Sequence, residues 1–309
     1  MNSRIRVLCL DVEGGHGGSS KSLFELVRHI DDPYCDVEVI CRRTSHLVQR
    51  YAEMEVPCSV WPQMVAENAV SRPSRNLIKY ARGALGLGVY RYAIRKLAKR
   101  INEEFDLVHF NHEGLFLLAR ALRGLVDVPF TMHGRTTIAD NAFGRWQCRM
   151  ISQVIDEMVF ITENEQRNFM KLGGNRPSIV INNAVGADIS EAEPITKIAN
   201  DVRFKVAHLN SYSQTHGGDR VIEIAGATRE LGCHDVLFVV AGHTALEPSI
   251  IQRFGLASGN ISDLREYAAL LGVEDSIEFL GHVTHTDRVL ASCDALVSPS
   301  RLSHPWGRA

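Results

Sequence analysis

The sequence has no long hydrophobic run, no paired-cysteine motif and almost no net charge. No segment approaches the ~20 apolar residues of a membrane-spanning helix, and the first residues are too polar for a signal peptide. The seven cysteines are scattered without a C-x-x-C pair, which favours reduced thiols over a disulfide framework. A net charge of -2 gives no overall attraction to nucleic acid. We therefore expect a cytoplasmic protein that does not bind nucleic acid.

Short apolar segments alternate with amphipathic segments along the whole chain. The expected strands are 6–11, 36–42, 58–62, 107–111, 129–134, 158–162, 178–185, 203–210, 235–242, 276–281 and 295–300. The expected helices between them are 20–30, 45–54, 114–124, 163–174, 218–231, 261–271 and 286–292. Strands that alternate with helices in this way predict α/β domains with parallel, doubly wound sheets.

One polar segment interrupts this alternation. Residues 191–201 are polar, contain a proline and lack strong periodicity, so we expect a linker between a domain at 1–190 and a second at 202–309. The second domain has four expected strands, whereas a doubly wound domain usually has five or six. We therefore expect that this domain is incomplete and that the natural chain continues beyond Ala309.

A glycine-rich loop joins the first expected strand to the first expected helix. It reads VEGGHGGSSKS (12–22) and includes Gly17 and Gly18. Glycines allow close backbone approach, and a helix N-terminus presents free N–H groups to an anion such as phosphate. The loop is neither G-x-G-x-x-G nor a P-loop. A turn without a ligand is the alternative.

Two further polar sites follow strands. His133, in TMHGR (131–135), lies at the carboxyl end of a strand, where a neutral imidazole could hydrogen-bond a sugar hydroxyl. A structural histidine is the alternative. In LNSYSQTHGGDR (209–220), Ser211 and His216 lie near a helix start and suit phosphate. Two such loops in tandem domains suggest a ligand held between the domains.

Metal and cofactor sites are not expected. Two histidine pairs, His109 with His112 and His282 with His285, are spaced by three residues but lie at strand ends, without a Cys or carboxylate cluster nearby in the sequence. No Asp-x-Asp pair of the kind that holds a divalent ion on a nucleotide diphosphate is present. We therefore expect neither a metal ion nor a cofactor.

The segment 72–100 is strongly basic. It has nine Lys and Arg residues and no acidic residue, with apolar residues interleaved at roughly helical spacing. One hypothesis is that this amphipathic segment makes peripheral contact with an anionic membrane surface. The alternative is a helix pair with one face in the core and a solvated basic face.

The order of several motifs resembles that of the family 4 glycosyltransferases. The resemblance covers nearly the whole chain and is densest in the second domain: FVVAGH (238–243), LREYAALLGVEDSIEFLGHV (264–283) and VLASCDALVSPSRLSHPWGR (289–308). In the first domain GGSSKSLFEL (17–26), His133-Gly134 and VINNAV (180–185) also match. The resemblance implies the GT-B fold, in which two Rossmann-like doubly wound domains flank a cleft.

The resemblance also implies an activity and a set of site residues. The protein would be a retaining glycosyltransferase of hexosyltransferase type, acting in polysaccharide biosynthesis on a nucleotide-sugar donor and a glycan or lipid-linked acceptor. Gly17 and Gly18 would approach the donor diphosphate or the acceptor, and His133 would contact the transferred sugar. The backbone at His282 and Val283 would meet the nucleobase. The donor loop would comprise Ser300, Arg301, His304, Trp306, Gly307 and Arg308, with Arg301 or Arg308 assisting departure of the diphosphate.

The chain departs from the family pattern at three positions, and a fourth family position falls outside it. Ser211 and His216 stand where the family usually has Arg and Lys against the donor phosphates. His304 stands where a first glutamate is expected, and the second would fall three residues past Ala309. Two alternatives therefore stay open: a non-catalytic nucleotide- or glycan-binding relative, and a GT-B nucleotide-sugar epimerase.

Overall fold

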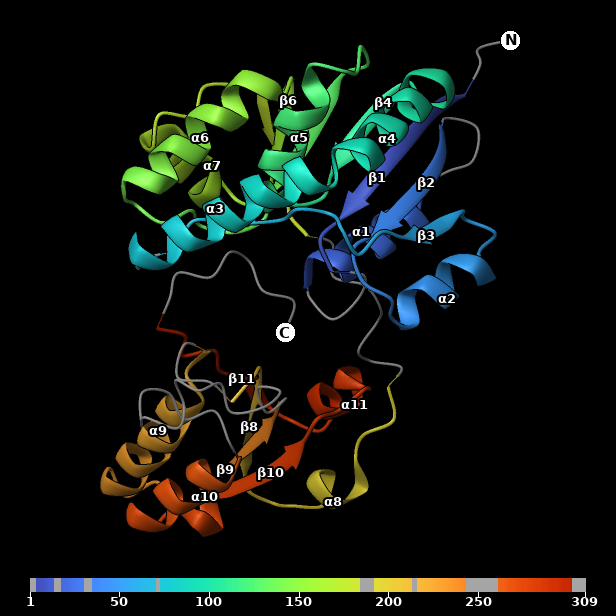
Figure 1. The fold of residues 1–309 in the computed structure, drawn as a ribbon. Helices are drawn as coiled ribbons and strands as arrows, with labels where there is room; N and C mark the ends of the chain where they lie inside the picture. Colours follow the sequence, from blue (N-terminus) through green and yellow to red (C-terminus); the bar gives the residue numbers. More distant parts are fainter. Residues whose placement is uncertain are drawn as a thin grey trace. The chain divides into compact units, whose positions relative to one another are not determined.

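The computed structural model describes residues 4–13, 18–30, 35–70, 73–183, 192–212, 216–242 and 261–301. The chain divides into two compact units, one formed by residues up to Val185 and one that begins at Gly186. Each unit is a parallel sheet with helices on both of its faces (Figure 1).

The first unit is built on a seven-stranded parallel sheet. Its strands are β1 (Ile5–Asp11), β2 (Cys35–Cys41), β3 (Cys58–Val60), β4 (Leu107–Phe110), β5 (Phe130–Gly134), β6 (Glu157–Phe160) and β7 (Ser178–Val180). Their order in the sheet is β3-β2-β1-β4-β5-β6-β7. The direction of winding reverses between β1 and β4, and ligands of open α/β sheets bind at the carboxyl end of such a switch point.

Helices cover both faces of this sheet because alternate strand residues face opposite sides. The helices are α1 (Gly18–Arg28), α2 (His46–Glu53), α3 (Pro73–Val89), α4 (Arg91–Glu104), α5 (Phe116–Arg123), α6 (Ala142–Val154) and α7 (Glu163–Lys171). In β1, Cys9 packs in the cluster formed with α1 and α2. Its neighbours Leu8 and Leu10 pack in the larger cluster that includes α4 and α5. This period of two is the signature of a strand buried on both faces.

The second unit repeats the arrangement on a smaller scale. Its strands are β8 (Phe204–Leu209), β9 (Val236–Ala241), β10 (Ile277–Gly281) and β11 (Ala295–Leu296), in the order β10-β9-β8-β11. Helices α9 (Gly218–Glu230) and α10 (Ile261–Leu270) contribute to the core on one face. The short helices α8 (Thr196–Ala199) and α11 (Thr286–Ala291) contribute to the core on the other. The switch point of this sheet lies between β8 and β11.

The predicted doubly wound α/β class is confirmed, and each of the eleven expected segments contains a strand. Two helices were not predicted. Helix α6 starts at an Asn141 cap, which accepts hydrogen bonds from the backbone N–H groups of Phe143 and Gly144. Helix α8 lies within the segment expected to be a linker. It forms there because Ile198 is buried in the core of the second unit and the Ile195 N–H donates to Ser292 Oγ at 2.7 Å.

Candidate functional site

Buried polar residues gather at the switch point of the first unit. Asp11 is the last residue of β1, and Asn111 directly follows β4. His133 is the second-to-last residue of β5, and Arg135 directly follows this strand. The four polar side chains are all less than a tenth exposed. Because buried polar groups need partners, their hydrogen bonds define the geometry of the site.

Asp11 and Asn111 attach the start of helix α1 to the sheet. Ser20 Oγ donates to Asp11 Oδ2 at 2.5 Å, and Asn111 Nδ2 donates to Asp11 Oδ1 at 2.8 Å. Asn111 Nδ2 also lies 3.1 Å from the carbonyl oxygen of Ser19. These bonds fix the first turn of α1, whose N–H groups can bind an anion, beside β4.

Arg135 extends this network toward β5 and the segment after β7. Its Nη2 donates to Asn111 Oδ1 at 2.6 Å and its Nε to the Asn111 carbonyl at 3.1 Å. Its Nη1 donates to Asn183 Oδ1 at 3.2 Å, which also accepts a hydrogen bond from Ser22 Oγ at 2.8 Å. The buried guanidinium thus joins residues that are far apart in the sequence into one rigid group.

The contacts of His133 determine where its proton lies. Arg135 Nη2 is 3.2 Å from His133 Nδ1, and His109 Nε2 is 3.4 Å from the same atom. Guanidinium nitrogens only donate, so Nδ1 of His133 must accept and its proton must lie on Nε2. Burial first, and then the Arg135 charge, hold the pKa of His133 far below its usual range. His133 is therefore a neutral imidazole, and its Nε2–H has no hydrogen-bond partner among the described residues.

His109 is held neutral for the same reasons, which makes the first unit sensitive to acid. Burial and the Arg135 charge lower the pKa of His109 to about 3. In the unfolded chain the pKa is about 6.5, so below that pH the unfolded state binds a proton that the folded state does not. Stability therefore falls as the pH falls, by about 2 kcal/mol for this residue between pH 7 and pH 5. We expect chemical denaturation at pH 7 and pH 5 to show that His109→Gln loses about 2 kcal/mol less stability than the parent over this range. An equal loss of stability in both proteins would contradict this assignment.

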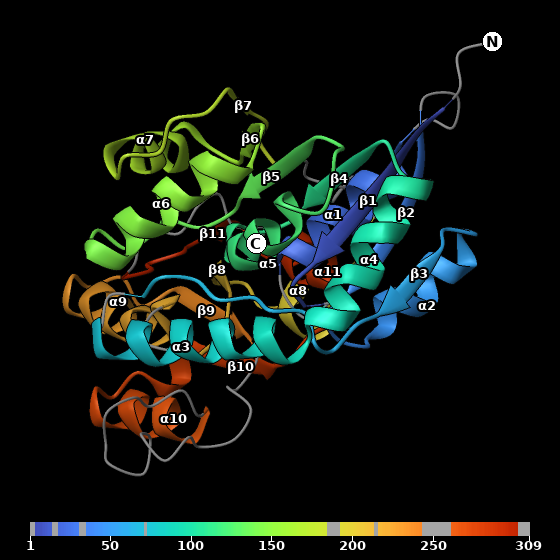
Figure 2. The ribbon, with the colours of Figure 1, turned by 45° about the horizontal axis from the view of Figure 1, so that its top comes forward.

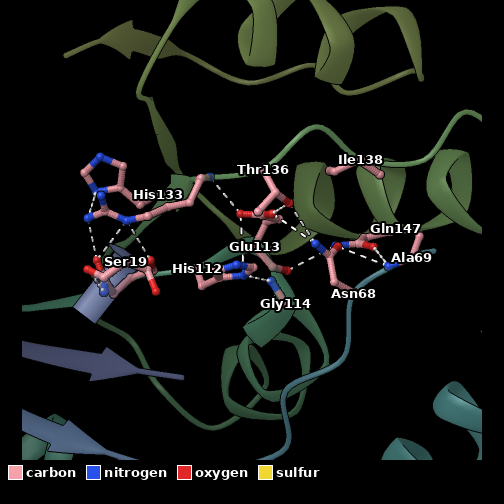
Figure 3. Close-up of polar contacts among 12 residues, drawn as sticks. Ser19, Asn68, Ala69, His112, Glu113, Gly114, His133, Thr136, Ile138 and Gln147 are labelled. Carbon is pink, nitrogen blue, oxygen red and sulfur yellow. Dashed lines mark hydrogen bonds and ion pairs between the residues drawn. The ribbon is translucent and has the colours of Figure 1, made fainter. Parts of the chain in front are cut away.

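Glu113 accepts hydrogen bonds from the segment that follows β5 (Figure 3). It begins a 3₁₀ turn after β4 and is fully buried. Its Oε2 accepts from the Arg135 backbone N–H at 2.8 Å, while its Oε1 accepts from Thr136 Oγ1 and, at 3.1 Å, from Asn68 Nδ2. Asn68 is held in turn by Gln147 Nε2 at 2.7 Å. These contacts fix the backbone that carries His133, although Glu113 does not touch its imidazole.

Glycine is required at position 134 because the backbone there lies close to the side chain of Phe160 in the neighbouring strand β6. A Cβ added at this position would lie 2.5 Å from the Phe160 ring. We expect Gly134→Ala to destabilise the protein by about 1–3 kcal/mol because the buried ring must move. Gly124→Ala is the control, since no atom lies within 4 Å of its added Cβ. Similar melting temperatures for the two variants would contradict this expectation.

The second unit places the other candidate residues around the start of α9. Ser211 follows β8, His216 precedes α9 by two residues, and Ser300 and Arg301 follow β11. The carbonyls of Pro299 and Ser300 accept hydrogen bonds from Arg220, a residue of α9, at 3.3 and 3.5 Å. The carboxyl ends of β8 and β11 therefore lie beside the N-terminus of α9 and the Arg220 guanidinium.

Arg301 already has acidic partners. Its Nη1 lies 2.5 Å from Asp219 Oδ1, and its Nη2 lies 3.9 Å from Glu223 Oε1. The contact with Asp219 raises the pKa of Arg301 above its usual value. Its charge is thus partly balanced within the second unit.

The remaining candidate residues are more dispersed. His282 and Val283 follow β10, at the far edge of the sheet from β11, and Val283 packs against the core beside α11. Gly18 begins α1, with no atom within 4 Å of an added Cβ. Gly17, His304, Trp306, Gly307 and Arg308 lie outside the described residues.

Sequence reasoning missed the residues that hold the first-unit site together. The main omissions are Asn111, Glu113 and Arg135 in the first unit and Arg220 in the second. Asn111 is the last residue of an expected strand, and Glu113 and Arg135 closely follow expected strands, so a polar residue at a strand end is the signal that could have identified them. Among the described residues, no group of three or more His, Cys, Asp or Glu side chains is placed to hold a metal ion. Nor is any described helix long and apolar enough to cross a membrane.

The family model for Glycosyltransferase Family 4 matches residues 16–189, which is more than half of the chain. The matched region contains most of the first unit, including His133, Arg135 and their partners. No curated protein gives a significant match to the sequence.

Solved structures of glycosyltransferases share the fold of the whole chain. HepE from Anabaena, solved with UDP, has a TM-score of 0.73 at 18% identity over 98% of this chain and 76% of its own. A glycosyltransferase from Rickettsia africae has a TM-score of 0.65 at 12% identity, over 98% and 74% of the two chains. Sucrose-phosphate synthase from Thermosynechococcus elongatus gives 0.65 at 12% identity, over 98% and 77%. At these identities the likeness establishes the GT-B fold. Because the family model covers most of the first unit, the chain belongs to Glycosyltransferase Family 4 and is a glycosyltransferase.

Proposed function

We propose that this enzyme transfers a sugar from a nucleotide-sugar donor to a glycan or lipid-linked acceptor, with retention of anomeric configuration. The observation that carries the proposal is the neutral His133, which presents Nε2–H at the switch point of the first sheet. HepE, which shares the fold, has been solved with UDP and with UDP-glucose. Its likeness supports a nucleotide-sugar donor for this chain.

In this proposal His133 binds the sugar as a hydrogen-bond donor. A sugar hydroxyl accepts from Nε2–H, while Arg135 holds Nδ1 and thus sets the orientation of the ring. Neutrality matters because positive charge develops at the anomeric carbon as the diphosphate leaves. An imidazolium would repel that charge, whereas a neutral ring adds a hydrogen bond without this cost.

The start of α1 is proposed to receive an anionic group of the donor or the acceptor. Its first turn is fixed by Asp11 and Asn111, and the space around Gly18 is open. Backbone N–H groups in a fixed turn stabilise negative charge without reorganising during the reaction.

The second unit is proposed to bind the donor diphosphate at the start of α9. The N–H groups of this 13-residue helix and the Arg220 guanidinium supply positive potential beside Ser300. Arg301 contributes less net charge because it is paired with Asp219. No protein nucleophile is assigned, so the proposed reaction is a same-face displacement.

Donor binding tests the proposal directly. Calorimetric titration of the protein with UDP-, GDP- and ADP-sugars should show that one nucleotide class binds, with Kd between about 1 μM and 1 mM. Arg220→Gln should weaken this binding about ten-fold, because it removes a cation next to the diphosphate site.

Arg229→Gln is the matched control for Arg220→Gln. Arg229 lies in the last turn of the same helix and pairs with Asp275, so its loss should leave donor affinity unchanged. A protein that binds none of the three nucleotide classes contradicts the proposed function. Equal effects of the two variants contradict the diphosphate site alone.

A further inference from the structure

Helix α3 presents apolar side chains on its outer side. Leu77, Ile78, Leu85 and Val89 are 65%, 69%, 69% and 65% exposed. Ala81 and Ala84, which lie between them on the helix, are exposed as well. A surface helix normally places charged or polar side chains on this side. A contiguous exposed apolar face of this kind marks an interaction surface.

The helix cannot turn this face inward because its opposite side is firmly packed. Asn76 is fully buried and exchanges hydrogen bonds with the backbone of Val70, both at 2.7 Å. Tyr80 is buried and donates its hydroxyl proton to Gln147 Oε1 at 3.2 Å. A Cβ added at Gly83 would lie 2.8 Å from a methyl group of Leu117. The outer face is therefore fixed by the core.

The sequence of α3 and most of α4 is strongly basic. Between Pro73 and Asn102 the sequence has eight Lys and Arg residues and no Asp or Glu. Some of the eight have acidic partners outside this stretch, such as Arg82 with Glu67 and Arg100 with Glu38. Four exposed cations have no ion-pair partner in the described part of the chain: Arg75, Arg91, Arg95 and Lys96. An uncompensated cationic surface attracts an anionic partner.

Helix α4 follows α3 directly in the sequence, and Figure 2 shows the two helices running in different directions from their junction. In α4, Ile94, Ala98 and Ile101 are buried, while Arg95 and Lys96 are exposed. The alternative of a core face and a solvated basic face thus describes α4. In α3 the exposed side carries apolar side chains as well as Arg75 and Arg82. Tyr92, at the start of α4, is 80% exposed.

We infer that α3 and the first turns of α4 form a docking surface for an anionic lipid bilayer. The α3 side chains would enter the boundary between headgroups and acyl chains, and the four unpaired cations would contact lipid phosphates. Tyr92 is an aromatic residue of the type that favours this boundary. The apolar side chains of α3 and the unpaired cations on α3 and the first turns of α4 fit such a bilayer better than another protein, because both kinds of side chain have a partner there. The inference extends the proposed function, since a lipid-linked acceptor would be presented at this surface, but it does not depend on the donor site.

Vesicle co-sedimentation with the whole protein tests the inference. We expect binding to phosphatidylcholine vesicles that contain about one third phosphatidylglycerol, and little binding to phosphatidylcholine alone. The double variant I78S/L85S should bind the anionic vesicles about 100-fold less tightly, since two large apolar side chains no longer insert. The matched control is L231S/L270S, which changes two leucines of the second unit that are 82% and 80% exposed.

The cations are tested separately with R91Q/R95Q/K96Q. Each cation near an anionic surface contributes about five-fold to binding, so this variant should also bind about 100-fold less tightly. Added salt should weaken binding of the parent in the same direction. The control is R145Q/R167Q/K171Q, which removes three cations elsewhere on the first unit.

Three results would overturn the inference. They are equal binding to the two kinds of vesicle, undiminished binding by I78S/L85S, and self-association of the parent that I78S/L85S abolishes in the absence of vesicle binding. The last result would assign the face to a second copy of the chain. Donor titration of the same variants should match the parent. Failure of vesicle binding and failure of the proposed function therefore give different results.

Discussion

Replacing His133 with alanine is expected to lower turnover about 100-fold while changing donor Kd by only a few-fold. The imidazole supplies one buried hydrogen-bond donor, and loss of one preorganised donor in an active site costs about 10²- to 10³-fold in rate. The effect falls mainly on turnover because, in the proposed mechanism, the bond strengthens as the sugar departs. Steady-state kinetics and calorimetric titration, measured on the same preparations, provide the two quantities.

His133→Gln is the informative companion of this variant. The glutamine amide can donate a hydrogen bond in place of Nε2–H and can accept from Arg135, so it should restore part of the lost activity. His109→Gln changes the neighbouring buried imidazole, which bonds to Thr131 Oγ1 at 2.9 Å, and should affect turnover much less. If His133→Ala retains parental turnover, or if His109→Gln lowers turnover as much, His133 is a structural residue.

Replacing Glu113 with alanine is expected to destabilise the first unit by about 3–5 kcal/mol. The change leaves the backbone N–H of Arg135, the Asn68 amide and the Thr136 hydroxyl without the fully buried carboxylate that is their shared acceptor. A buried donor that loses its partner has neither a protein acceptor nor water to bond to, which destabilises the folded state. Denaturation followed by tryptophan fluorescence measures the loss, because Trp146 packs on Tyr80 in this unit.

Two further variants define the cause of this loss. Glu113→Gln keeps one acceptor oxygen and should cost less than alanine, although its amide nitrogen faces other donors. Glu103→Ala removes a carboxylate that is 60% exposed and pairs only weakly with Lys99, so it should change stability by less than about 1 kcal/mol. Equal losses in Glu113→Ala and Glu103→Ala would show that the buried network does not stabilise the unit.

The sequence pattern predicted the fold better than it predicted the site. Strands such as β1 and β9 are apolar runs bounded by polar turns, so each is visible in a short window. Parallel sheets then bring their carboxyl ends together, which correctly placed His133 at the carboxyl edge of the sheet. Helix α8 was missed because its one buried residue, Ile198, gives too weak a periodic signal.

The partners of His133 could not be predicted because they come from distant parts of the chain. Asn111 and Asp11 are 100 residues apart, and Arg135 and Asn183 are 48 apart, so no local pattern connects them. The proton position on His133 depends on Arg135, which only the folded geometry reveals. The same limit applies to α3, where the sequence showed apolar residues at helical spacing but not which of them the core would cover.

Sugar transfer itself is the decisive assay for the proposed activity. The protein is incubated with the bound nucleotide sugar, labelled in its sugar, and with a lipid extract as the source of acceptors. We expect label to enter an acceptor in step with release of the nucleoside diphosphate, and we expect His133→Ala to slow both about 100-fold. Epimerised nucleotide sugar without acceptor labelling, or no reaction with any nucleotide sugar that binds, would contradict the proposed activity.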